Sequence, residues 1–138
     1  MMRYLEDLSI GTPFQCGSVH AEADEVAAFA RRYAPGSSPL DAAAAPSLYT
    51  LAVCMGCMAG AVGDVAIVCD LGIDAVTAAR PVHAGDALRV DACWTQARKS
   101  TVLPGQGVAR IVVRGVFADG GDAIRFAVRH LVRCRVGP

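Results

Sequence analysis

Residues 47–62 read SLYTLAVCMGCMAGAV and contain no charged side chain, and the nearest charges on either side are Asp41 and Asp64. Ser47 is a good N-cap residue, so the sequence predicts a helix that starts there and runs to about Val62. Because this helix is apolar on every side, we expect it to be buried all round. The apolar stretch is shorter than the roughly 20 residues that a membrane span needs, and glycines interrupt it. It therefore predicts a core helix.

The sequence on both sides of this helix predicts mainly strands. One strand is expected at 14–19, followed by a first helix at 22–33 with acidic residues in its first turn and arginines in its last. The later strands, of which the last three alternate with period two, are expected at 65–73, 75–80, 87–97, 107–118 and 123–135. Such alternation is typical of antiparallel sheets. The predicted fold class is α+β, an antiparallel sheet wrapped around one buried helix, in a single domain of residues 1–138.

Composition narrows the functional classes. The 138 residues are 54% hydrophobic and carry 13 basic and 13 acidic side chains, so the formal net charge is zero. A chain this apolar can bury a core, which argues against global disorder. A neutral chain is not typical of a nucleic-acid binder or of a polybasic membrane-surface protein. With no signal-peptide pattern and no membrane span in the sequence, we expect a cytoplasmic protein that handles a small molecule or pairs with another chain.

Six cysteines raise the alternatives of a disulfide framework, a metal site or a redox motif. Cys54 and Cys57 have CxxC spacing, but no second pair and no neighbouring histidine completes a zinc site. In a chain that can build its own core, free buried thiols are expected instead. We predict that these cysteines fill the core and that the chain binds no metal.

Several segments resemble one known family. They are YLEDLSIG at 4–11, EADEVAAFA at 22–30, RPVHAGDAL at 80–88, and the glycines of 105–107 preceded by Lys99 and Ser100. In this order and spacing they resemble the MaoC-like (R)-specific enoyl-CoA hydratases and dehydratases, which have the hot-dog fold. The resemblance runs over nearly the whole chain, from Tyr4 to Arg135.

This resemblance implies a substrate, a reaction and a partner. The substrate would be an enoyl or 3-hydroxyacyl thioester of coenzyme A or of an acyl carrier protein, with no cofactor beyond the coenzyme A or phosphopantetheine of the substrate itself. The reaction, that of a lyase, would add water to a double bond or remove it. The partner would be a second hot-dog chain, identical or related, paired edge to edge. The start of the buried helix would offer backbone N–H groups to the thioester carbonyl.

The loop that would carry the catalytic pair departs from the family pattern. The family has an aspartate and, five residues later, a histidine, and these positions fall on Ala34 and Pro39 here. Neither residue can transfer a proton, and each positioned acid or base is typically worth about 10²–10⁴-fold in rate. Pro35 and Asp41, which frame the family's loop, are present. The standard hydratase mechanism is therefore not expected from this loop.

The remaining candidate site residues each have a structural alternative. Asp41 is a candidate base or a loop residue, and Tyr49 is a candidate hydrogen-bond donor to a carbonyl or a packing residue. Ser47 is an N-cap or a substrate contact. Leu48 stands where the family usually has glycine, which keeps the amide in place but narrows the approach.

Charged and histidine side chains give further candidates. Arg80 and Lys99 are candidate phosphate contacts or solvated strand-end charges. Among the histidines, His130 is predicted in the core or an interface, whereas His20 and His83 are predicted to be solvated.

Three functions follow from this resemblance and from the residues that depart from the family pattern. The leading prediction is a MaoC-like protein that binds an acyl thioester or a similar apolar ligand but lacks the hydratase pair, as a non-catalytic subunit or a diverged enzyme. The second is an active hydratase or dehydratase, in secondary metabolism for example, that uses other residues. The third is a structural dimer with a closed pocket. Whether the chain is an enzyme stays open. A thioesterase is disfavoured because residues 48–63 contain no Asp or Glu.

Overall fold

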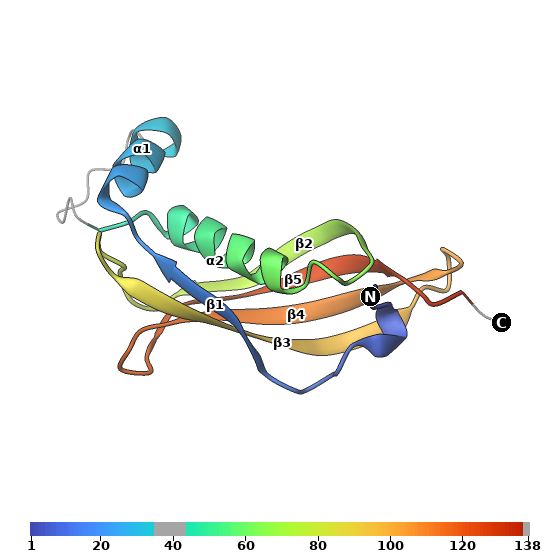
Figure 1. Cartoon of the computed structure of the whole chain (residues 1–138). Helices are drawn as coiled ribbons and strands as arrows, with labels where there is room; N and C mark the ends of the chain where they lie inside the picture. The colour runs from blue at the N-terminus through green and yellow to red at the C-terminus, as the bar shows by residue number, and fades with distance from the viewer. Residues whose placement is uncertain (35–43, 137–138) are drawn as a thin grey trace.

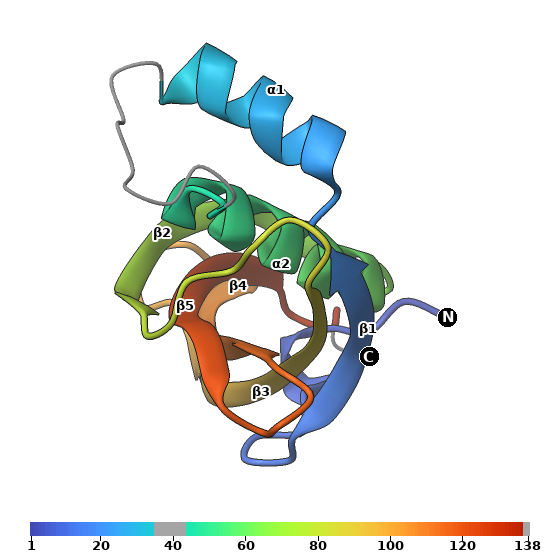
Figure 2. The same ribbon diagram turned by 90° about the vertical axis from the view of Figure 1, so that its left-hand side faces the viewer.

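The computed structural model describes residues 1–34 and 44–136. In these residues a single antiparallel sheet of five strands, ordered β1-β3-β4-β5-β2, curls around the helix α2 (Figures 1 and 2). The elements are η1 (Leu5–Asp7), β1 (Phe14–His20), α1 (Ala23–Tyr33), α2 (Ser47–Ala61), β2 (Ile67–Ala78), β3 (Ala87–Lys99), β4 (Gln106–Val116) and β5 (Asp122–Arg133). The predicted α+β architecture is confirmed.

The core lies between α2 and the inner face of the sheet. Alternate residues of β3, β4 and β5 point toward α2 and are almost completely buried, while their neighbours point outward. The largest of these side chains are Trp94, Ile111 and Phe126, none of which is more than 1% exposed. This is the period-two pattern expected for a sheet that buries one face and wets the other.

The expectation that α2 is buried all round is wrong for the chain on its own. The sheet covers one side of the helix, where Thr50, Cys54 and Met58 are buried, whereas Tyr49 is buried against α1. On the other side Leu48 is 61% exposed. The physical reason is that an open five-stranded sheet can curl around one side of a helix but cannot close over it.

The start of α2 also differs by one residue from the prediction. Ser47 is the first residue of the helix, and Pro46, with φ −57° and ψ 142°, precedes it as the cap residue. Among the described residues no side chain caps this end. The prediction of Ser47 as N-cap is therefore wrong, and its hydroxyl is not needed for capping.

The two strands predicted at 65–73 and 75–80 form one strand, β2, at the edge of the sheet. Its pairing with β5 is interrupted by irregularities, and Ala75 adopts a left-handed conformation with φ 53°. With these irregularities the strand continues past the polar Asp74, at which the sequence had predicted a break between two strands. The outer edge of β2 is unpaired in the described chain, and the apolar side chains of Val68, Leu71, Ile73 and Val76 are 43–48% exposed.

Candidate functional site

A small cavity lies beside the start of α2. Ser47 and Thr50 line it from the helix, Ala78 and Arg80 from the end of β2 and the segment after it, and Ile124 from β5. Its volume is about 170 Å³. The structure thus brings together two of the predicted site residues, Ser47 and Arg80, which are distant in the sequence.

Backbone donors and one buried hydroxyl-bearing residue give this cavity its polarity. The amides of Ser47 and Leu48 lie in the first turn of α2, where no intrahelical acceptor exists, and the helix hydrogen bonds begin with the Tyr49 amide, 2.9 Å from the Pro46 carbonyl oxygen. Thr50, one turn further, is buried. Helix N-termini carry a partial positive charge, so a carbonyl oxygen or an anion is favoured here.

Arg80 is fixed by the β4–β5 hairpin. Its guanidinium donates to both carboxylate oxygens of Asp119, at 2.9 and 3.2 Å, and lies 3.9 Å from the ring centre of Phe117. The same guanidinium holds the pKa of the Asp119 carboxyl below its usual value. Arg80 is therefore a preorganised part of the cavity wall, and a ligand phosphate would share it with Asp119.

Tyr49 faces α1 and is not among the residues that line the cavity. Its hydroxyl donates a hydrogen bond to a carboxylate oxygen of Glu25 at 2.7 Å, and the ring of Phe29 packs edge-on against it at 5.7 Å. Burial, aided by Glu25, raises the pKa of the Tyr49 phenol to about 12. The structure shows it as an anchor for α1, with a hydroxyl that stays protonated at neutral pH.

The other predicted site residues lie apart from the cavity or outside the described residues. Lys99 is at the opposite end of the sheet, where its ammonium is 3.8 Å from Glu6. Ala34 ends α1, and its amide donates to the carbonyl of Ala30 at 3.0 Å. Pro39 and Asp41 fall outside the described residues.

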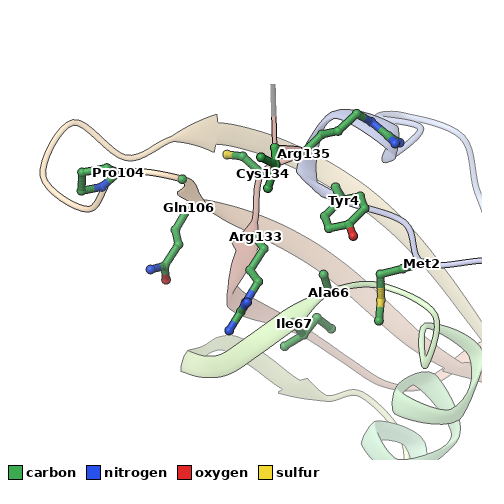
Figure 3. Close-up of a pocket in the computed structure, with 11 residues that line it drawn as sticks. Met2, Tyr4, Ala66, Ile67, Pro104, Gln106, Arg133, Cys134 and Arg135 are labelled. Carbon is green, nitrogen blue, oxygen red and sulfur yellow. The ribbon is translucent and has the colours of Figure 1, made fainter. Parts of the chain in front are cut away.

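A second, larger cavity was not anticipated from the sequence. It has a volume of about 780 Å³ and lies at the other end of the sheet, between the N-terminal segment, the β3–β4 connection and the end of β5 (Figure 3). Tyr4, Ile67, Gln106, Arg133 and Arg135 are among its lining residues. The only sequence signal was the Gly105–Gly107 turn of the family resemblance, because the lining comes from four separate segments.

One of the two arginines that line this second cavity is paired with a carboxylate of the same chain. The Arg135 guanidinium pairs with Asp7 and lies 5.2 Å from the ring centre of Tyr4. This pairing holds the pKa of the Asp7 carboxyl below its usual value. Arg133 forms no ion pair within the described part of the chain.

His130 is a buried core residue. Its Nδ1 atom is 2.7 Å from a carboxylate oxygen of Asp70, and its ring packs edge-on against Trp94 at 5.8 Å. Burial lowers the pKa of the imidazole, although Asp70 acts in the opposite direction. His130 does not line either of the two cavities described above. In the described residues no group of side chains could hold a metal ion, and no helix has the length and apolarity to cross a membrane.

Comparisons with known proteins place this geometry in a structural class. No protein-family model matches the sequence, and no curated protein does. Among solved structures, a MaoC-like dehydratase from Rhodospirillum rubrum superposes with a TM-score of 0.84 at 22% identity, covering 98% of this chain and 99% of that one. A protein from Mycobacterium tuberculosis described as having a double hotdog fold gives a TM-score of 0.76 at 19% identity, covering 99% of this chain and 46% of that one. The chain has the hot-dog fold.

An R-hydratase from Pseudomonas aeruginosa shares this hot-dog architecture, with a TM-score of 0.72 at 18% identity over 96% of this chain and 86% of that one. The structural neighbours thus include MaoC-like dehydratases and R-hydratases, as the sequence resemblance predicted. At these identities the likeness establishes the fold. The cavity at the start of α2 is therefore a feature of a hot-dog protein in which α2 is the central helix.

Proposed function

We propose that this hot-dog protein binds an acyl thioester of coenzyme A or of an acyl carrier protein, or a similar apolar ligand, and does not run the standard hydratase reaction. The observation that carries the proposal is the cavity at the start of α2, where Ser47 of the first helical turn, the buried Thr50 and the fixed Arg80 meet. The structural neighbours described as a MaoC-like dehydratase and an R-hydratase support it.

The cavity suits the thioester end of such a ligand. A carbonyl oxygen would accept hydrogen bonds from the amides of Ser47 and Leu48, an arrangement that polarises the carbonyl as an oxyanion hole does. With about 170 Å³, the cavity is smaller than the roughly 300–1,000 Å³ of complete ligand sites. It therefore takes a short acyl group and the thioester, while the rest of the ligand lies on the surface or against a partner chain.

The proposed loss of hydratase chemistry rests on the end of α1. Ala34 stands where the family resemblance would place the catalytic aspartate, and its methyl group cannot accept a proton. The phenol of Tyr49 in α2 is hydrogen-bonded to Glu25, and its raised pKa of about 12 makes it a very weak acid. Binding without turnover, as the non-catalytic subunit of a pair, follows from this arrangement.

A second hot-dog chain is the partner we propose. The unpaired apolar edge of β2 and the exposed side of α2 would be covered by an identical or a related chain. The double hotdog protein from Mycobacterium tuberculosis is described as carrying two such folds in one molecule. If the partner is a related chain, it would bring the acid–base pair that this chain lacks.

Binding of butyryl-CoA, a saturated thioester that cannot be hydrated, tests the proposal by calorimetry. We expect binding to the wild type, with an affinity reduced at least about tenfold, or about 1.4 kcal/mol, in Ser47→Trp, which fills the cavity. Ser18→Trp on the exposed surface of β1 is the matched control and should bind like the wild type. Absence of binding to the wild type would instead favour a structural dimer with a closed pocket.

Hydration of crotonyl-CoA separates the proposal from the active-enzyme alternative. We expect no turnover by the purified chain. Turnover above about 1 s⁻¹ that is lost in Asp41→Asn or Tyr49→Phe would contradict the proposal and show an active hydratase with unusual residues.

A further inference from the structure

The face of the sheet that points away from α2 is rich in arginine. Cross-strand neighbours point to the same side of a sheet, so the pairing registers of β3, β4 and β5 assign these side chains to one surface. We call this surface the arginine face, and it comprises Arg89, Arg98, Arg110, Arg114, Arg125, Arg129 and Arg133. Three aspartates pair with these arginines: Asp74, Asp91 and Asp122.

Like charges stand directly opposite each other on this surface. Arg110 is the register partner of Arg129, and Arg114 is the register partner of Arg125. Such pairs destabilise a sheet unless carboxylates or a partner compensate them. Asp74 lies between the first pair, 3.3 Å from Arg110 and 3.7 Å from Arg129.

Compensation within the chain is incomplete. Asp122 accepts a hydrogen bond from Arg114 at 2.9 Å, but Arg125 beside it forms no ion pair within the described residues. Arg133, further along β5, is equally unpaired in that part of the chain. The arginines outnumber their aspartates by seven to three in a chain whose net charge is zero. The arginine face therefore has a net positive charge, and the rest of the chain carries the acidic residues that balance it.

The spacing of the unpaired arginines indicates the size of the complementary group. Arg125 and Arg133 are both exposed on β5 and are separated by eight residues, which corresponds to about 26 Å along a strand. A row made of Val112 and Ala127 separates the two opposed arginine pairs. One small anion cannot span this distance, whereas the side of a folded protein can.

We propose that the arginine face docks an acidic protein surface. The aspartates interspersed among the arginines would repel the continuous phosphate backbone of a nucleic acid, but they can be matched by the mixed charges of a protein. Docking would supply carboxylates to Arg125 and Arg133, and it would be steered by the separated charge.

The arginine face adjoins the cavity at the start of α2. Arg125 is the register partner of Thr77, one residue before the cavity residue Ala78, and it follows the cavity residue Ile124 in β5. Given the proposed function, the acidic protein is the carrier of the acyl group, so that the thioester arrives on an acyl carrier protein and not on free coenzyme A. Docking of an acidic protein rests on the arginines alone, whereas its identification as the carrier rests on the proposed function.

Binding of an apo acyl carrier protein, which has no acyl group to offer the cavity, tests the docking surface. We expect binding at about 50 mM NaCl that weakens steeply as salt shortens the range of charge interactions. Arg125→Glu/Arg133→Glu should weaken it by at least about tenfold, and Arg125→Gln/Arg133→Gln by less. Arg31→Glu/Arg32→Glu on α1 makes the same charge change on exposed residues elsewhere and should bind like the wild type. Circular dichroism of each variant checks folding, and the glutamine pair gives a milder variant should the glutamate pair fail to fold.

The outcomes separate this inference from the proposed function. No binding of the carrier to the wild type, equal weakening by the α1 control, or tighter binding of duplex DNA than of the carrier would each overturn the docking surface. Butyryl-CoA binding, measured on the same proteins, should be unchanged in Arg125→Glu/Arg133→Glu. If the wild type binds the carrier but not butyryl-CoA, the docking surface stands and the proposed thioester site fails.

Discussion

The hydroxyl of Tyr49 donates a 2.7 Å hydrogen bond to the carboxylate of Glu25, and this contact joins the central helix α2 to α1. Both views of the chain show α1 on the outer side of α2, away from the sheet (Figures 1 and 2). Tyr49 is 3% exposed, and its aromatic contact with Phe29 lies in the same junction. The position of α1, and with it that of Ala34 at its end, thus depends on a few side chains around Tyr49.

Removing this hydrogen bond should loosen α1. We expect Tyr49→Phe to lower the free energy of unfolding by about 1 kcal/mol, since the acceptor is charged but largely exposed. Glu25→Gln should have a smaller effect in the same direction, and the double variant should lose less than the sum of the two. Urea denaturation of the four proteins measures this. Tyr33→Phe, on the exposed end of α1, is the control and should be neutral. Additive losses would show that the two side chains act independently.

The same contact gives a pH dependence at the alkaline end. The pKa of Tyr49 is about 12 in the folded chain, above the ordinary value of 10, so the unfolded chain loses this proton first. The stabilisation is therefore complete below pH 10 and is lost as the pH rises from 10 toward 12. Denaturation midpoints over this range should fall less in Tyr49→Phe than in the wild type.

At the acid end, His130 should make the protein lose stability. Burial lowers the pKa of its imidazole below 6.5, so the unfolded state binds a proton more readily than the folded state. Stability is then full above pH 6.5 and falls as the pH drops through 6.5 toward the folded pKa. His130→Leu removes this group while leaving His20 and His83 unchanged. The unfolding free energy of the wild type minus that of the variant should decrease as the pH falls. If this difference stays constant from pH 7.5 to 5, the assignment is contradicted.

Two glycines should respond oppositely to alanine. At Gly107 a Cβ atom would overlap the carbonyl oxygen of Arg98 and lie 2.5 Å from a methyl group of Leu5, and backbone cannot move aside cheaply. Gly107→Ala should therefore destabilise the chain by about 2 kcal/mol, as overpacking does. Gly56, in the middle of α2, has nothing within 4 Å of this position, so Gly56→Ala should stabilise by about 0.5–1 kcal/mol. Thermal unfolding of both variants checks the contrast.

The elements that the sequence predicted correctly are those whose environment repeats along the chain. Val90, Ala92 and Trp94 alternate with polar neighbours because β3 has one buried and one wet face, and this alternation is visible without a structure. The break at Asp74 could not be interpreted in the same way. It looked like the end of a strand, but the left-handed Ala75 carries β2 past it as an irregularity.

The sequence could identify site residues only by their position at the ends of predicted elements. Ser47 and Arg80 were candidates because each begins or follows an element, and the structure does place them at one cavity. Lys99 was grouped with them, but β3 is long enough to carry it to the far end of the sheet. Neither the second cavity nor the facing pairs such as Arg114 and Arg125 could be inferred, because they depend on the register between strands.

The exposed edge of β2 leads to a prediction about assembly. Its apolar side chains, among them Leu71 and Ile73, are about half exposed on a strand whose outer backbone groups have no partner in the described chain. An apolar, unpaired edge of this length favours pairing with another strand, and in a two-fold dimer the same edge serves both chains. We expect a dimer of the purified chain in solution, or a heterodimer with a related hot-dog chain. Leu71→Lys/Ile73→Lys places two charges on the edge and should give a monomer in light scattering at micromolar concentration.

Val102→Lys/Leu103→Lys adds the same charges to exposed residues of the β3–β4 connection and should remain dimeric. A dimer that survives the β2 variant would place the interface elsewhere, with the open side of α2 around Leu48 as the next surface to test.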